Sequence, residues 1–217
     1  QTFPQAVQVL LDPADCGPVC ISLCQDIQGE IFDYPEDFFK EKIHNIRRPR
    51  PDDFQIKEAA EKIKKSKNPI IISGGGVFYS DAMEELSTFA VKHNIPVTQT
   101  VMGYSSMKRD HSHFLGPIGG LGGKAANNFA KKTDLAIAIG TKLGDFTTGS
   151  WSNFENPNFS LVSINVARFD ASKHMAQSII GDAKVSLNEL SQALGDWKAS
   201  EEWHKKSRDE LKSWNEY

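Results

Sequence analysis

Hydrophobic and polar positions alternate in two distinct ways between residues 52 and 195. Some stretches place apolar residues three or four positions apart, as amphipathic helices do, and others are short runs that are apolar throughout. Such runs are typical of strands covered on both faces of a parallel sheet. Helices that alternate with buried strands predict parallel pairing and right-handed crossovers. We therefore expect an α/β domain at residues 52–195, a Rossmann-like doubly wound parallel sheet.

The apolar runs and the helical spacing predict individual elements. Strands are expected at residues 70–72, 95–100, 135–140, 161–165 and 178–181. Helices are expected after a cap at Asp52 or Asp53, and at 81–93, 124–132 and 183–194. Residues 111–123, which hold two histidines and five glycines, are expected to form a loop.

The first 51 residues have a different pattern. Helical spacing at residues 3–11 is followed by an apolar strand at Val19–Cys24. One helix and one strand cannot make a domain, so residues 1–30 are expected to be a loosely held remnant of a preceding α/β domain, with an unpaired strand edge. Residues 31–51 contain prolines that favour extended backbone, and we expect an interdomain linker there.

The last segment, residues 196–217, consists of strong helix formers. Tryptophans 197, 203 and 214 have little core of their own within the segment. We expect a linker helix whose tryptophans pack against a missing C-terminal domain.

Composition narrows the function classes. The chain has 217 residues, 39% hydrophobic and 24% charged, with a formal net charge of -3. This balance gives no electrostatic footprint for nucleic acid, and no apolar run approaches the 18 residues of a membrane span. The three cysteines are expected to be free thiols, buried or half-buried, in a cytoplasmic protein. Because the chain does not begin with Met, we expect a piece of a longer protein.

Candidate chemistry gathers in the loops that follow the predicted strands, where open parallel sheets bind ligands. Glycines 74–76 follow the first strand of the domain, and polar side chains follow two later strands. A nucleotide pocket and an empty, degenerate pocket are equally compatible with this pattern. The candidate nucleotide-binding residues are Gly74, Gly75, Gly76, Lys142, Asp145, Asn165 and Arg168.

No catalytic or metal-binding constellation is found in the sequence. His111 and His113 would face opposite sides of an extended chain, so a metal site is not expected there. The serines at 105 and 106 lack a nucleophile elbow.

The order of these segments resembles the thiamine-diphosphate-dependent enzymes of the acetolactate synthase type. Gly17–Gln28 resembles the closing strand of their pyrimidine-binding domain, with Cys24 where proline is common. The central domain is matched by Pro69–Tyr79, Gly140–Gly149 and Ser163–Val166. The resemblance implies a central Rossmann-like domain between pyrimidine-binding and pyrophosphate-binding domains that are missing here.

Within that superfamily, several strings resemble the ring-opening trihydroxycyclohexanedione hydrolases of myo-inositol breakdown. These are Gln25–Glu30, Ile46–Pro51, Gly74–Ser80, Gly140–Thr148 and Ile164–His174. The resemblance implies C–C bond hydrolysis that opens a cyclic 1,2-dione. It assigns no catalytic residue to this chain, because the activating Glu and the Mg²⁺/diphosphate motif belong to the missing domains, so the fragment alone is expected to be inactive.

The resemblance also implies cofactors and partners. Thiamine diphosphate and Mg²⁺ are expected in the full-length enzyme, as a homodimer or homotetramer. FAD is not expected, because Lys142 stands where flavin-binding relatives carry Arg, and Asn165 and Ala167 stand where they carry acidic residues. Three alternatives stay open: the central domain of an acetolactate synthase-like carboligase or decarboxylase, a non-catalytic nucleotide-binding module, and an interaction scaffold.

Overall fold

The computed structural model describes residues 2–216, and the chain divides into two units between Arg47 and Arg48. We call residues 2–47 the N-terminal unit and residues 48–216 the sheet unit. The division falls inside the segment predicted as a linker, residues 31–51. The assignment of residues 1–30, 31–51, 52–195 and 196–217 to domains and linkers stays a prediction.

The sheet unit is built on six parallel strands in the order β3-β2-β1-β4-β5-β6. The predicted Rossmann-like doubly wound sheet is therefore confirmed. The strand order changes direction between β1 and β4, which is where such sheets open a crevice at their carboxyl edge. The strands are β1 Pro69–Ser73, β2 Val97–Gln99, β3 Phe114–Pro117, β4 Leu135–Ile139, β5 Ser160–Asn165 and β6 Gln177–Ile180.

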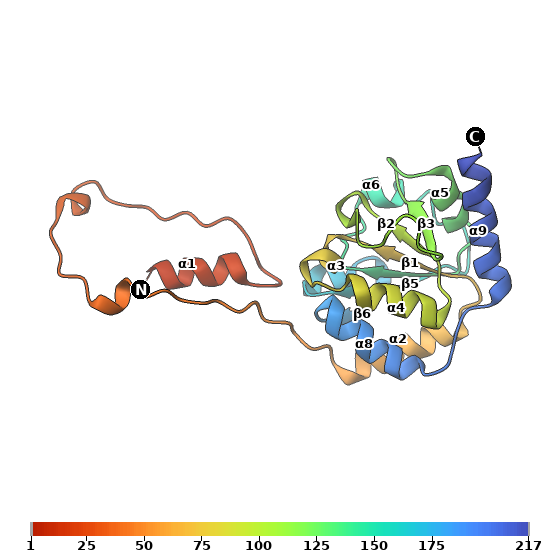
Figure 1. Ribbon diagram of the computed structural model, residues 1–217, viewed down its shortest axis with the longest axis horizontal. Helices are drawn as coiled ribbons and strands as arrows, with labels where there is room; N and C mark the ends of the chain where they lie inside the picture. The colour runs from red at the N-terminus through yellow and green to blue at the C-terminus, as the bar shows by residue number, and fades with distance from the viewer. Residues whose placement is uncertain (1, 217) are drawn as a thin grey trace. The chain divides into compact units, whose positions relative to one another are not determined.

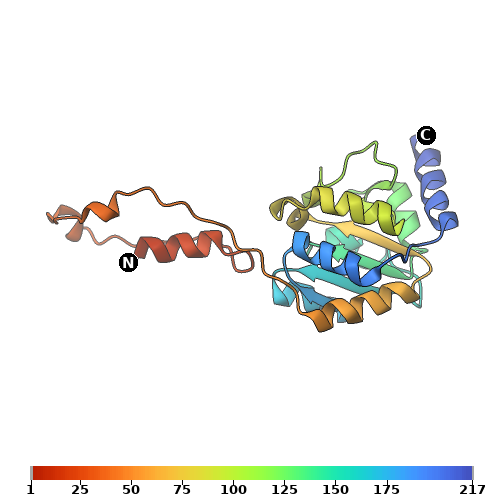
Figure 2. The same cartoon turned by 60° about the horizontal axis from the view of Figure 1, so that its bottom comes forward.

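Helices cover both faces of this sheet (Figures 1 and 2). On one face α2 (Asp53–Lys65), α8 (Ala183–Leu194) and α4 (Met83–His93) pack side by side. On the other, α5 (Lys124–Ala130) packs against α9 (Glu201–Asn215) beside the edge strand β3. Short helical segments complete the connections: α3 Gly75–Tyr79, η3 Val101–Gly103, α6 Asp145–Thr148, α7 Arg168–Ser172 and η4 Lys173–Met175.

The core lies on the two central strands. Every residue of β1 and β4 is buried, as expected for strands covered on both faces. The helices meet them with small or branched residues, such as Ala59 and Ile63 of α2, and with the larger Leu86 and Phe89 of α4. Burial of each large side chain contributes about 1.5–3 kcal/mol, so this contact layer dominates the stability of the sheet unit.

The connection after β1 differs from the prediction. A helix was expected to start at Asp81, but α3 already starts at Gly75, with Gly74 as its N-cap, and α4 starts only at Met83. Asp81 lies between the two helices with a φ of 52°. Glycine has a poor helix propensity, and tertiary packing overrides it here.

The region predicted as a loop at 111–123 contains the strand β3, Phe114–Pro117. The sequence pattern does not identify this strand, because it contains a glycine and a proline, which are both rare inside strands. It is tolerated as an edge strand, paired on one side with β2.

The start of the sheet unit is fixed to the helices around it. Arg48 donates hydrogen bonds to the Ser80 carbonyl and to Asp182 Oδ2, the latter at 3.1 Å. The Asp182 N–H in turn donates to the Pro49 carbonyl at 2.8 Å. The last residues of the predicted linker therefore pack as part of the sheet unit.

The predicted C-terminal helix is present as α9, but the expectation that its segment's tryptophans pack on a missing domain is wrong for Trp203 and for Trp197, which is partly buried against the core of the sheet unit. The Trp203 side chain is only 4% exposed, lies 4.1 Å from the Phe129 ring between centroids, and donates from Nε1 to the Pro69 carbonyl at 2.8 Å. Trp214, near the end of α9, is 43% exposed. The core that receives Trp203 comes from residues far away in sequence, which the local pattern does not reveal.

The N-terminal unit confirms one predicted element and corrects two expectations. Helix α1 spans Thr2–Leu11, with single turns at η1 (Ile27–Gly29) and η2 (Glu36–Phe38). The segment expected to form a strand at Val19–Cys24 is irregular, because no neighbouring strand supplies hydrogen bonds. The three cysteines, expected to be buried or half-buried, are all exposed.

Across residues 2–216, none of the helices is both long enough and apolar enough to cross a membrane.

Candidate functional site

The loops after β1 and β4 cross at the point where the strand order changes direction. The Gly74 N–H donates to the Ile139 carbonyl at 2.8 Å, and the Gly76 N–H donates to the Gly140 carbonyl at 2.9 Å. A Cβ placed on Gly74 would lie 2.3 Å from the Gly140 oxygen, and one on Gly76 would lie 2.6 Å from the Gly140 Cα. Backbone packs directly on backbone here, which only glycine allows.

This crossing limits what the glycine loop can bind. A phosphate cradle at a strand-to-helix turn needs free backbone N–H groups. Two of the three glycine amides are donated within the protein, and the Gly75 amide, at the first position of α3, is the one not used in this way. The glycines therefore have a packing role, and their predicted contact with a nucleotide stays a prediction.

The loop after β4 places two predicted residues in solvent. Lys142 and Asp145 are both exposed, and Asp145 is the first residue of α6. Between them, Leu143 is buried with a φ of 48°, and its N–H donates to Thr141 Oγ1 at 3.3 Å. This turn holds the side chains of Lys142 and Asp145 out of the core, where they are free to meet a ligand or another protein surface.

The loop after β5 uses one predicted residue internally and exposes the other. Asn165 donates from Nδ2 to the Thr141 carbonyl at 3.3 Å and accepts the Ala167 N–H at Oδ1 at 3.0 Å. Its amide thus ties the ends of β4 and β5 together. Arg168, the first residue of α7, is exposed. The structure brings all seven predicted residues to the carboxyl edge, with direct contact between the Gly74–Gly76 and Gly140 backbones.

Sequence reasoning missed an apolar rim at this same edge. Large hydrophobic side chains on the short helices and turns after the strands are more than half exposed. The sequence could have identified these residues, because they follow predicted strands. Only the polar residues of those segments were considered as candidates. Exposed apolar surface of this kind is typical of a contact with another molecule. The rim consists of Phe78, Tyr79, Val101, Met102, Tyr104, Phe146 and Phe169.

A buried polar network supports the part of the rim that follows β2. Ser73 Oγ lies 2.6 Å from Ser106 Oγ, and Gln99 donates from Nε2 to Ser106 Oγ at 3.2 Å and to the Met107 carbonyl at 2.9 Å. Gly103 packs so closely that a Cβ there would lie 2.1 Å from the Ser73 oxygen. Ser106 is 1% exposed, so it positions the loop and cannot act as a nucleophile on a bound substrate.

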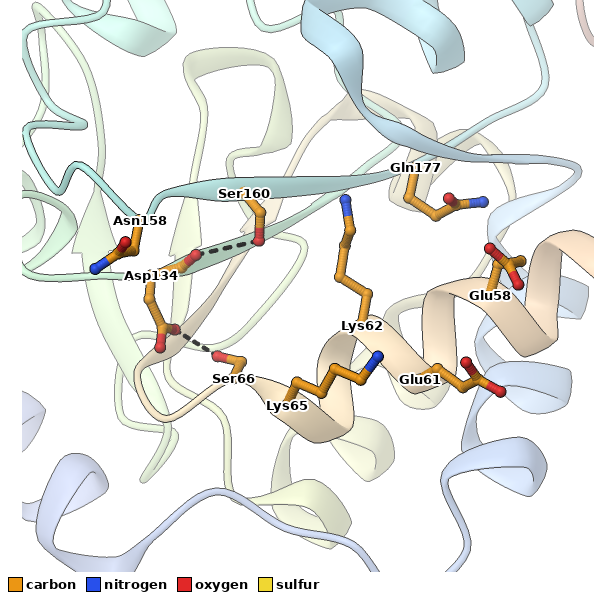
Figure 3. Close-up of a pocket in the computed structure, with 9 residues that line it drawn as sticks. All are labelled: Glu58, Glu61, Lys62, Lys65, Ser66, Asp134, Asn158, Ser160 and Gln177. Carbon is orange, nitrogen blue, oxygen red and sulfur yellow. Dashed lines mark hydrogen bonds between the residues drawn. The ribbon is translucent and has the colours of Figure 1, made fainter.

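A cavity of about 430 Å³ lies at the opposite, amino edge of the sheet, between α2 and the starts of β5 and β6 (Figure 3). Three carboxylates and two lysines line it, so its formal charge is -1 and it has no preference for an anion. Asp134 is already used, because it accepts hydrogen bonds from Ser66 Oγ and from the Lys67 and Asn68 amides. The lining is Glu58, Glu61, Lys62, Lys65, Ser66, Asp134, Asn158, Ser160 and Gln177.

Residues 2–216 contain no group of three His, Cys, Asp or Glu side chains placed to hold a metal ion. The rings of His111 and His113 are 5.7 Å apart between centroids, and each has hydrogen-bond partners within the protein.

Comparisons with known proteins agree on one family. The family model described as "Thiamine pyrophosphate enzyme, central domain" matches residues 56–190. A protein of Clostridium perfringens strain 13 is 49% identical over 189 residues, covering 87% of this chain and 30% of that protein. One of Clostridium botulinum strain Alaska E43 is 46% identical over 207 residues, covering 95% and 32%. Both are named 3D-(3,5/4)-trihydroxycyclohexane-1,2-dione hydrolase.

A third relative, from Bacillus cereus strain ZK, is 45% identical over 190 residues, covering 88% of this chain and 30% of the relative, and is named 3D-(3,5/4)-trihydroxycyclohexane-1,2-dione hydrolase 1. The chain thus spans about a third or less of the length of these curated relatives.

The described residues do not fit the cofactor that this family implies. A diphosphate needs an anion cradle and its divalent ion needs clustered carboxylates, whereas two of the glycine amides at the carboxyl edge are used internally and no metal-binding group is present in residues 2–216. No step of a thiamine-dependent reaction is assigned to residues of this chain. The match over residues 56–190 and the parallel sheet of flanked strands agree with one another, and the chain belongs to the family of thiamine pyrophosphate enzyme central domains.

Proposed function

We propose that this chain forms the central domain of a thiamine-diphosphate-dependent hydrolase that opens the ring of 3D-(3,5/4)-trihydroxycyclohexane-1,2-dione by C–C bond hydrolysis in myo-inositol degradation, in the cytoplasm. The observation that supports it is the 45–49% identity to relatives with that name over most of this chain. Thiamine diphosphate and Mg²⁺ are bound by the pyrimidine-binding and pyrophosphate-binding domains, and the 217 residues alone are inactive.

The apolar rim supports a partner on the carboxyl edge. Met102 is 72% exposed and Phe169 77% exposed, on two different loops of that edge. Exposed side chains of this size are stabilised when another protein surface covers them. We assign the pyrimidine-binding and pyrophosphate-binding domains as that surface, within a homodimer or homotetramer.

A domain exchange tests the proposed reaction. Residues 48–195 of this chain replace the matching segment of the full-length Clostridium perfringens relative, and ring opening is measured with thiamine diphosphate and Mg²⁺. We expect kcat/KM within about tenfold of the parent, because the exchanged segment carries no catalytic residue. A folded chimera without ring opening would contradict the proposal, and one that condenses pyruvate instead would favour the acetolactate synthase-like alternative.

The same chimera tests the rim. Met102→Glu places a charge on the rim, and Val91→Glu places one on α4, where the parent side chain is 53% exposed. Burying an unpaired charge at a domain contact is costly. We expect Met102→Glu to lower the melting temperature and activity of the chimera by several degrees and several-fold, and Val91→Glu to change neither. Equal effects of the two variants would argue against a contact at the rim.

The seven predicted residues keep a limited capacity for a nucleotide. Lys142 and Arg168 are exposed cations at the carboxyl edge, whereas Gly75 is buried at the start of α3. We propose at most a residual contact with a nucleotide phosphate and no FAD binding. Saturating thermal stabilisation by ADP, abolished in a Lys142→Ala, Arg168→Ala double variant, would support the contact, and stabilisation by FAD would contradict the second part.

A further inference from the structure

The segment after α8, residues 195–216, is held on the sheet unit by backbone and histidine contacts, and we call it the C-terminal arm. The Ala199 N–H donates to the His93 carbonyl at 2.9 Å, and Asn94 Nδ2 donates to the Ala199 carbonyl at 3.2 Å. His93 Nδ1 lies 2.7 Å from the Trp197 carbonyl, which can only accept, so this nitrogen carries a proton. The arm is thus fixed at the end of α4 before α9 begins.

A second contact joins α9 itself to the sheet unit. His113, directly before β3, is 6% exposed and stacks on His204 of α9, with ring centroids 4.1 Å apart and planes at 18°. His113 Nε2 donates to Asn94 Oδ1 at 3.2 Å, and His204 Nε2 donates to the Ser112 carbonyl at 3.1 Å. A positive charge on one ring is destabilised by a positive charge on a ring stacked against it.

The charged and titratable groups that act on His113 are all bases. On α9 they are His204 and Arg208, and on its own loop it is His111. Helix α4 and the residue that caps its end face the cluster with the neutral side chains of Ser87 and Asn94. A carboxylate, Asp110, acts on His111. A proton added to His113 would therefore be buried beside the Arg208 cation and two other bases, with no carboxylate acting on His113.

The electrostatic effect agrees with this geometry. Burial, and then the nearby His204, His111 and Arg208, lower the pKa of His113 from 6.5 to about 4. His111 adds a geometric conflict, because its Nδ1 accepts the His113 backbone N–H at 3.1 Å and cannot do so when protonated.

We propose that the stacked His113–His204 pair is an acid-sensitive latch, which holds the C-terminal arm on the sheet unit at neutral pH and weakens that attachment when His113 is protonated. The open arm exposes His113 to water and lets it bind a proton at its ordinary pKa of 6.5, whereas the closed arm resists protonation down to about 4. Opening therefore takes up protons, and the attachment is fully present above pH 6.5 and is lost progressively as the pH falls toward 4. At pH 5 proton uptake by His113 alone is expected to make the opening constant of the arm about 30-fold larger than at high pH.

Amide hydrogen exchange of the 217-residue chain tests the latch. Exchange of peptides from α9 and from α8 is measured at pH 7.5, 6 and 5 and corrected for the intrinsic exchange rate at each pH. We expect the protection factor of α9 to fall about 20- to 30-fold by pH 5, while that of α8 stays within about threefold. Equal protection of α9 at all three pH values, or a parallel loss in α8, would overturn the proposal.

Three variants test which side chains the pH effect depends on. His113→Gln removes the buried base, and we expect it to reduce the pH effect on α9 to less than about threefold. His204→Gln changes a half-exposed side chain, keeps the test valid if His113→Gln does not fold, and should reduce the effect at least about threefold. The matched control is His174→Asn, which removes an exposed histidine outside the latch at a φ of 60° that Asn tolerates. An undiminished pH effect in His204→Gln, or the same reduction in the control, would contradict the latch.

Discussion

Similar apolar side chains are buried in the sheet unit and exposed in the N-terminal unit. Ile137, in the middle of β4, is completely buried, and Ile31 of the N-terminal unit is 101% exposed. The runs Leu135–Ile139 and Val19–Cys24 are both largely apolar, yet only the first forms a strand. The difference is the partners, since β4 pairs with β1 on one side and β5 on the other. An apolar run specifies a strand only where neighbouring strands complete its hydrogen bonds.

Truncation of one isoleucine in each unit should give the largest difference in the free energy of unfolding between the two units. Ile137→Ala removes buried methyl groups and leaves a cavity between two layers of helices, and we expect a loss of about 2–5 kcal/mol in the free energy of unfolding. Ile31→Ala removes no buried contact, so its effect should lie within about 0.5 kcal/mol. Urea denaturation followed by circular dichroism measures both. A large effect of Ile31→Ala would show that the N-terminal unit has a core.

Substitution of one glycine in each unit tests whether the two units also differ in how closely their backbone is packed. Gly74→Ala places a Cβ 2.3 Å from the Gly140 oxygen, and the backbone must shift at a cost of about 1–3 kcal/mol. A Cβ added to Gly29 in the N-terminal unit would meet nothing within 4 Å, and Gly29→Ala should be neutral or slightly stabilising. Thermal unfolding of the two variants checks this. If Gly74→Ala were tolerated, the two loops would not cross as closely as described.

Substitution of one aspartate in each unit should give the smallest difference in stability between the two units. Asp182 caps α8 by accepting the Lys184 N–H at 3.0 Å and also pairs with Arg48, so Asp182→Ala should cost about 1–2 kcal/mol. Asp37 pairs with Lys40 at the surface of the N-terminal unit, with both side chains more than two-thirds exposed, and Asp37→Ala should cause no measurable change. Denaturation midpoints compare them. Equal midpoints for the two variants would mean that the cap and the Arg48 pair contribute nothing.

The sequence pattern predicts most of the sheet unit but not the contacts that shape its ends. The runs at 135–140 and 161–165 are apolar enough to identify β4 and β5 directly. The edge strand β3 was missed because Gly116 and Pro117 disguise it, and the position of Trp203 was missed because its partner Phe129 lies 74 residues away. Long-range packing of this kind leaves no local signal.

The sequence predicts where the candidate site lies, but it does not predict which of its groups are free to bind a ligand. The carboxyl edge follows from the alternation of helices and strands, and all seven candidate residues lie there. Whether a glycine amide is free or donated depends on the crossing of two loops, as between Gly76 and Gly140, which are 64 positions apart. The apolar rim was overlooked because exposed hydrophobic residues look like core residues in a sequence.

The burial of Trp203 affects the wavelength of its fluorescence emission. An indole that is enclosed against Phe129 and hydrogen-bonded to the Pro69 carbonyl emits at shorter wavelength than one in water, such as the partly exposed Trp214. Because Trp203 lies on the same helix as His204, any lifting of that helix would shift its emission toward the red. The chain has four tryptophans, so lifting of the C-terminal arm is expected to shift the Trp203 part of the intrinsic fluorescence, without a label, in the unmodified chain.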